Sequence, residues 1–373
     1  MRVITRKIHP IFMTKCIRAT LKKQNYFSQS CQYFSQKADG FVQLRKEEFH
    51  VNPGFGTFRT TGNVGCIIKP ANPHEYPDAD RALVYVYGDS AASSKDVNIE
   101  LTGESKDVLT INAFPESHAM YCEVHLPIKY DLKIKLFNDA GVHIYGMEGD
   151  EVNINTFNGN INTKGLKSHN IHITTKMGSI IADGTLQGNL FVNAKNTSIT
   201  AKRLQGMAMS IDAEELETTI DSSYITQGEI TAHRGNICLK NLHGCTDLVL
   251  RKGNVSISGL HGQIAGFVGK GNMNVQVTEV TSNSTLHVNE GNMSISILED
   301  PRHNLEVTAP SLEIADEVLT KGSLCADTKQ TFTIKRNEDP EGNTLIATVL
   351  KGVAYLKIQD WFSGLGIKSA CSD

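Results

Sequence analysis

The chain has 373 residues, of which 40% are hydrophobic and 21% charged, and its formal net charge is −3. This composition excludes an intrinsically disordered protein, and no apolar run reaches the ~18 residues of a membrane-spanning helix. The eight cysteines include no C-x-x-C pair, so neither a disulfide framework, a zinc knuckle nor a dithiol redox motif is indicated.

The segment 1–38 differs from the rest of the chain because it contains eight basic residues and no acidic one, the first carboxylate being Asp39. Ile4, Ile8 and Ile11 can share one face of a helix, and the segment has no uninterrupted apolar region of the kind a secretory signal needs. We therefore predict a basic mitochondrial presequence, disordered in the free chain, and localisation to the mitochondrial matrix. A basic tail on a cytoplasmic protein is the alternative.

Without this segment the chain keeps 29 basic residues against 40 acidic ones. An acidic chain is a poor partner for nucleic acid or anionic lipid, so we expect neither, and no membrane span. A protein partner is expected, without a feature that names it.

Residues 39–150 are rich in short runs with the alternation of β-strands. A Pro-rich loop spans 69–77. Because a stack of strands needs an atypical end to cover its open edge, we expect this region to be an N-terminal β cap. The predicted strands cover 64–68, 83–87, 97–101, 108–111, 122–126 and 132–136.

Residues 151–330 form a repeat of short alternating segments divided by glycine-containing corners. One unit cannot bury its apolar face alone, so the units must stack. This predicts an all-β fold, a β-solenoid (parallel β-helix-like) with coils of about 17–21 residues, followed by C-terminal capping strands and a tail at 331–373. A sandwich satisfies the alternation but does not require the same corner in each turn. Repeat starts fall at Leu166, Leu186, Leu204, Ile225, Leu242, Leu260 and Val280.

Four Gly-Asn corners recur in phase. Glycine can adopt positive φ, and the amide of asparagine can bond the equivalent residue of the next coil, so the pattern predicts a structural ladder. Hairpin turns without a ladder remain the alternative. The residues are Gly235, Asn236, Gly253, Asn254, Gly271, Asn272, Gly291 and Asn292.

Small polar residues alternate with inward-facing aliphatic ones in the last repeats, which predicts a flat polar surface able to bind an extended partner. A merely solvated face is the alternative. The candidate binding residues are Ser256, Ser258, Asn274, Gln276, Ser294 and Ser296.

The corner rhythm in Asn158-Gly-Asn-Ile161, Arg234-Gly-Asn-Ile237 and Lys252-Gly-Asn-Val255 resembles the "putative adhesin" type of β-solenoid domain over roughly residues 140 to 330. The stretches 49–56 and 76–81, together with the basic leader, resemble an uncharacterised animal protein group, expected in mitochondria, that carries this domain. The resemblance implies the fold and supplies no catalytic residue.

Candidate catalytic chemistry is weak. A solenoid hydrolase or lyase needs carboxylates gathered on one strand face, whereas Asp183, Asp212 and Asp221 occupy different places in their repeats. His243 and His261 are in phase but lack a third ligand, so we predict no metal, no cofactor and no catalytic residue.

We therefore predict a non-enzymatic binding or scaffold module. A carbohydrate-active or other solenoid hydrolase or lyase is the alternative from another class. A third possibility is self-association through an open solenoid end.

Overall fold

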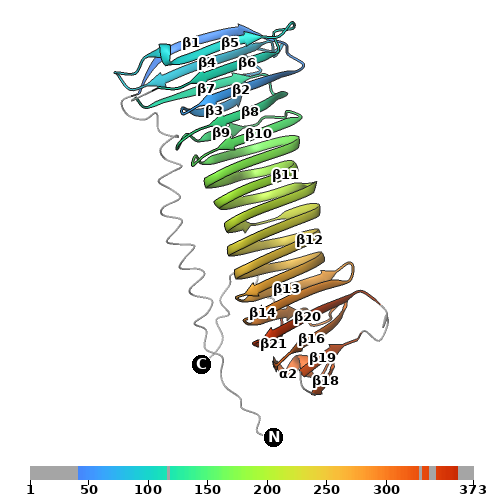
Figure 1. The fold of residues 1–373 in the computed structure, drawn as a ribbon. Helices are drawn as coiled ribbons and strands as arrows, with labels where there is room; N and C mark the ends of the chain where they lie inside the picture. The colour runs from blue at the N-terminus through green and yellow to red at the C-terminus, as the bar shows by residue number, and fades with distance from the viewer. Residues whose placement is uncertain (1–40, 116–117, 327–329, 336–341, 360–373) are drawn as a thin grey trace, which may run out of the picture.

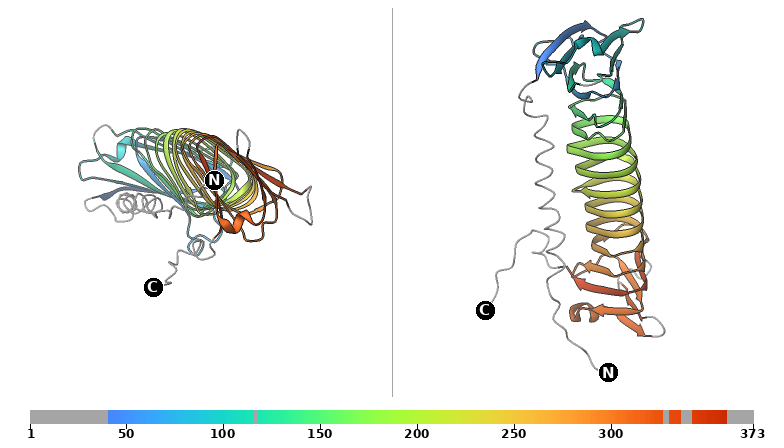
Figure 2. Two further views of the ribbon diagram at one scale, coloured as in Figure 1. Left: turned by 90° about the horizontal axis from the view of Figure 1, so that it is seen from below. Right: turned by 60° about the vertical axis from the view of Figure 1, so that its left-hand side comes forward.

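The structure, a computed structural model, describes residues 41–115, 118–326, 330–335 and 342–359. These residues form an elongated stack of flat coils, and seen along the stack the coils overlie one another as a flattened ring (Figures 1 and 2). Nearly all pairings between successive coils are parallel. The all-β solenoid prediction is thus confirmed. The predicted presequence lies outside the described residues.

The strands are numbered along the chain. They are β1 Val42–His50, β2 Gly56–Gly62, β3 Gly65–Pro70, β4 Arg81–Gly88, β5 Val97–Thr102, β6 Val108–Ala113, β7 Met120–Leu126, β8 Tyr130–Leu136, β9 Val142–Tyr145, β10 Glu151–Thr156, β11 Ile161–Ile220, β12 Ser223–Lys270, β13 Met273–Val280, β14 Ser284–Glu290, β15 Met293–Ile297, β16 Asn304–Ala309, β17 Ser311–Ile314, β18 Ser323–Ala326, β19 Gln330–Ile334, β20 Thr344–Lys351 and β21 Val353–Ile358. The short helices are η1 Ser94–Asp96 and α2 Asp316–Leu319.

Each coil contributes one strand segment to each of two broad faces. Face A contains β6, β2, β8, β10, alternate segments of β11 and β12, then β14, β20 and β16. Face B contains β7, β3, β9, the other segments of β11 and β12, then β13, β15, β21 and β17. The strands β11 and β12 continue through the corners, where the sequence predicted breaks.

The order of coils in space departs from their order in the chain at both ends. The coil β2–β3 lies between β6–β7 and β8–β9, although it comes first in the chain. The coil β20–β21 likewise lies between β14–β15 and β16–β17, although it comes last. The sequence places both pairs in caps, whereas the structure places them inside the stack.

Antiparallel strands close each end of the stack. At the N-terminal end β5 pairs with β6, and β1 and β4 extend face B beyond β7. At the C-terminal end β19 pairs with β16, and β18 pairs with β19. These strands end the run of parallel coils, and α2 contacts β21 beside them. Of the predicted C-terminal segment 331–373, residues 336–341 and 360–373 lie outside the described residues.

One hydrophobic core runs along the axis between the faces. Alternate residues point inward, as Val255 and Ile257 do, and the same alternation fills each coil with aliphatic side chains. The coil step is 19 residues from Asn170 to Asn189 and 18 from Asn236 to Asn254. Because the step is nearly constant, equivalent outward residues line up in columns along each face.

Candidate functional site

The predicted Gly-Asn corners form a continuous column. The Nδ2 atom of Asn254 donates to Oδ1 of Asn236 at 3.0 Å, and the backbone N–H of Asn272 donates to Oδ1 of Asn254 at 3.2 Å. Asn292 continues the pattern, its backbone N–H donating to Oδ1 of Asn272 at 3.0 Å. Each amide oxygen therefore satisfies a donor of the next coil, a structural role.

The glycines of these corners lie directly over one another. Gly253 has φ +141°, and a Cβ atom added there would lie 1.7 Å from the carbonyl oxygen of Gly235. Gly271 and Gly291 meet the same obstacle, at 1.7 and 1.9 Å from the carbonyl oxygen of the preceding coil's glycine. Only glycine fits this column, which therefore serves packing and presents no side chain to a ligand.

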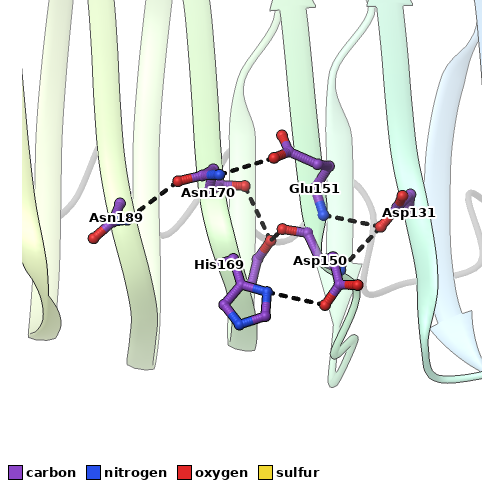
Figure 3. Close-up of polar contacts among 7 residues, drawn as sticks. Asp131, Asp150, Glu151, His169, Asn170 and Asn189 are labelled. Carbon is purple, nitrogen blue, oxygen red and sulfur yellow. Dashed lines mark hydrogen bonds and ion pairs between the residues drawn. The ribbon is translucent and has the colours of Figure 1, made fainter.

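A second polar ladder, which sequence analysis missed, follows the opposite corner of the stack (Figure 3). Oδ1 of Asp131 accepts the backbone N–H groups of Asp150 and Glu151, both at 2.9 Å. Asn170 donates to Glu151 at 2.8 Å and accepts from Nδ2 of Asn189 at 3.2 Å. The 19-residue recurrence of Asp, Glu and Asn was the available signal. The ladder satisfies corner backbone groups, so its carboxylates are structural.

His169 completes the cluster in Figure 3, its Nδ1 lying 3.0 Å from Oδ1 of Asp150. Both side chains are about four-fifths exposed, at 82% and 80%. An ion pair in such a position contributes little to stability and does not form an enclosed catalytic pair.

The stacking of consecutive coils brings together His243 and His261, the two histidines that recur in phase in the sequence. The ring of His243 lies 4.6 Å from that of Tyr224 and 5.1 Å from that of His261, whose Nδ1 is 3.4 Å from Oε2 of Glu279. Partial burial, and next the repulsion from His261, lower the pKa of His243. Among the described residues no three His, Cys, Asp or Glu side chains converge as metal ligands.

The carboxylates considered for hydrolysis are divided between the two faces. Asp183 and Asp221 lie on face B, where they form ion pairs with Lys202 and Lys240. Asp212 lines face A instead. These carboxylates therefore do not form the opposed pair that glycoside hydrolysis requires.

The predicted polar surface lies on face B as two columns. Strand register places Ser256 beside Asn274 and Asn274 beside Ser294. The second column contains Ser258, Gln276 and Ser296. Further along the face, alternating charges compensate one another in a column made of Lys164, Asp183, Lys202, Asp221 and Lys240.

Face A carries a hollow of about 540 Å³. Asn155, Thr174, Asn193 and Asp212 line it in successive coils, so its long dimension follows the axis of the stack. The residues on its corner side are Phe157, Lys176, Lys195, Glu214 and His233.

Aromatic rings and cations adjoin this hollow. The ammonium of Lys176 lies 4.4 Å from the ring centroid of Phe157, and that of Lys135 lies 5.4 Å from that of Phe137. Both rings are exposed, at 44% and 36%, and lie just beyond the ends of β10 and β8, at the corner edge of face A. The hollow could not be predicted from the sequence because it depends on which outward residues become neighbours.

The family model described as Toastrack DUF4097 matches residues 86–322. The chain belongs to this toastrack family. The match begins in β4 and includes β5 to β9, so the toastrack domain extends well before the Gly-Asn corners on which the sequence resemblance was based.

Solved structures similar to this toastrack chain include bacterial proteins described as putative adhesins. That of Bacteroides fragilis is 12% identical, with 86% of this chain and 97% of that chain covered and a TM-score of 0.28. That of Parabacteroides distasonis is 13% identical, with coverages of 85% and 98% and a TM-score of 0.33. In the described part of the toastrack chain, no helix has the length and hydropathy needed to span a membrane.

Proposed function

We propose that this toastrack protein is a non-catalytic binding or scaffold module whose binding surface is face A. The hollow lined by Asn155, Thr174 and Asn193 supports this proposal most directly, because it offers an elongated recess with side-chain amides on a rigid sheet. A partner surface that runs along the stack fits such a recess better than a compact ligand does.

Charge compensation favours face A over face B. On face B, Lys202 and Lys240 are paired with Asp183 and Asp221, so little charge remains to attract a partner. On face A, no ion pair involves Arg59 or Lys133 among the described residues, and exposed aromatic rings lie nearby. Uncompensated charge beside exposed aromatic surface is typical of interaction sites.

Site-specific photocrosslinking in cells tests the proposal. A photoreactive phenylalanine analogue at Asn193 places the probe in the hollow, and the same analogue at Ser256 places it on the predicted surface of face B. We expect one discrete adduct from the position of Asn193. Adducts from Ser256 alone would assign binding to face B, and no adduct from either position would contradict the binding-module proposal.

We also propose that residues 1–38 direct the chain to mitochondria, as their basic, carboxylate-free composition supports. Fractionation of cells that express the full chain or a form without residues 1–38 tests this. We expect only the full chain in the mitochondrial fraction. Equal distribution of the two forms would contradict it.

A further inference from the structure

Charge is segregated along face A. The N-terminal half carries exposed cations and the following coils carry exposed carboxylates. The side chains alternate with inward aliphatic residues, so they all point away from the core. The cations are Arg59, Lys133, Lys135, Lys176 and Lys195, and the carboxylates are Asp212, Glu214, Glu229 and Asp247, with an ion pair between Lys195 and Glu214 where the two sets meet. Arg251, at the corner edge of the acidic coils, is an exception, and Asp131 and Glu151 in the basic half are engaged in the corner ladder.

One column of outward-facing residues begins with two cations and ends with two carboxylates. Strand register aligns Arg59 with Lys133, and Lys133 with Asn153. Like charges on adjacent strands are unfavourable, so the placement of Arg59 beside Lys133 destabilises an isolated coil pair. Eight neighbouring strands contribute, in order, Arg59, Lys133, Asn153, His172, Phe191, Ser210, Glu229 and Asp247.

We infer that a second copy of this chain docks on face A, face to face and antiparallel. A two-fold axis that lies in the interface parallel to the strands, midway between those of His172 and Phe191, reverses the order of the column. Arg59 of each copy then faces Asp247 of the other, and Lys133 faces Glu229. The inference rests on the proposed function of face A and names its partner.

At the centre of this arrangement Lys176 of each copy faces Lys195 of the other. Glu214, 3.6 Å from Lys195 within one copy, lies on the next strand and offsets this pair of cations.

The rings of His172 and Phe191 stack within one copy at 4.8 Å, and the axis places His172 of each copy opposite Phe191 of the other. Asn155 faces Asp212, which supplies an amide donor to a carboxylate. A symmetric interface requires this self-complementarity, in which each contact occurs twice.

The size of the face suits a specific dimer. Eight strands about 4.8 Å apart, each about six residues long at ~3.3 Å per residue, cover roughly 760 Å². A standard specific interface buries about 800 Å² per partner. The exposed rings of Phe137 and Phe157 and the side chain of Val249, 39% exposed, supply apolar area on the same face.

A second copy is complementary in charge to both halves of face A, whereas a partner of uniform charge is complementary to only one half. A polyanion would be attracted by Lys133 and Lys135 but repelled by Glu229 and Asp247 a few coils away. A partner with the reversed order of charges is attracted at both ends of the face, and the antiparallel copy has that order because Arg59 and Lys133 meet Asp247 and Glu229.

Sedimentation velocity on the purified full chain tests the inference. We expect a dimer that weakens with added salt. The double variants Arg59→Glu/Lys133→Glu and Glu229→Lys/Asp247→Lys should each raise the dimer Kd at least about 100-fold, because each lost contact occurs twice. The matched control on face B, Lys164→Glu/Lys357→Glu, should leave the Kd unchanged.

Two rescues separate docking from misfolding. An equimolar mixture of the two double variants should form a one-to-one heterodimer. The variant that carries all four substitutions should form a homodimer again, because its charges are reversed throughout. A monomeric wild type, or a mixture that stays monomeric, would overturn the inference. Binding of single-stranded poly-uridine to a monomer through Lys133 would assign face A to a polyanion instead.

Photocrosslinking distinguishes this failure from failure of the proposed function. A monomeric chain that still gives an adduct from Asn193 retains a binding face with another partner. A monomeric chain that gives no such adduct would contradict both the dimer and the binding function of face A.

Discussion

The side-chain oxygen of Asn292 accepts a 3.0 Å hydrogen bond from the backbone N–H of Val353, 61 residues later in the chain. Within the regular stack the equivalent bond spans 18 to 20 residues. The amide ladder therefore continues into a coil whose chain arrives from elsewhere, and Gly352 occupies the glycine column at φ +146°.

Substitution of Gly352 by alanine should destabilise the C-terminal coils. The new Cβ atom would lie 1.9 Å from the carbonyl oxygen of Gly291, and the backbone is in a region that alanine disfavours. We expect the free energy of unfolding to fall by about 2 kcal/mol or more. Gly54→Ala is the control, since its nearest neighbour lies at 3.6 Å and its φ is not positive. Equal denaturation midpoints for the two variants would contradict this account.

Removal of one amide from the ladder should have a smaller effect. Asn254→Ala deletes a donor to Asn236 and an acceptor for Asn272, with all three side chains at the surface. We expect a loss of about 1 kcal/mol, measured by urea denaturation. Ser256→Ala in the same coil should change stability by less than about 0.5 kcal/mol. A loss for Asn254→Ala no larger than that of Ser256→Ala would show that the ladder is not stabilising.

Acid should weaken the fold through His143. Burial lowers the pKa of this imidazole from 6.5 to about 4, so the unfolded chain binds the extra proton first. Stability is therefore fully present above about pH 6.5 and decreases as the pH falls toward 4, by up to about 3 kcal/mol.

The variant His143→Gln checks this assignment. Its unfolding free energy should vary less between pH 6.5 and pH 4 than that of the wild type. His169→Gln, at a position whose side chain is 82% exposed, should keep the wild-type profile. A wild-type slope in the His143 variant would assign the acid sensitivity to another group.

Thiol labelling should separate the two buried from the two exposed cysteines among the five that the structure describes, Cys238 being half-buried. Burial raises the pKa of Cys122 to about 12 and raises that of Cys66 well above its usual range, so neither forms a thiolate in the native state. Cys245 and Cys325 are exposed. We expect maleimide to modify Cys245 and Cys325 but neither Cys66 nor Cys122 in native protein, as read by mass spectrometry, and all five after unfolding. Native modification of Cys66 would show that the N-terminal coils open.

The repeat could be predicted from the sequence because Gly253 and Asn254 recur in phase in neighbouring coils. The coil that contains Gly352 could not, because valine follows this glycine and the neighbouring coil lies 61 residues earlier. The ladder through Asp131 and Asn170 was also missed, since different residue types make equivalent bonds there.

The candidate surface was harder to predict. The alternation that places Ser256 and Asn274 side by side is visible within single repeats, and the structure aligns them on face B. The segregated charge of face A is not visible in this way. Arg59 and Lys133 are 74 positions apart in the chain, and only the insertion of β2 beside β8 makes them neighbours.

The insertion of a coil near each end also bears on how the stack comes apart. In a simple solenoid the terminal coil can unravel first, and each later coil can follow independently. Here the coils that come first and last in the chain, β2–β3 and β20–β21, each lie between two other coils. Neither can unfold without breaking two interfaces at once. Unfolding that begins at either end of the chain must therefore disrupt the interior of the stack, and the stack should unfold as one cooperative unit.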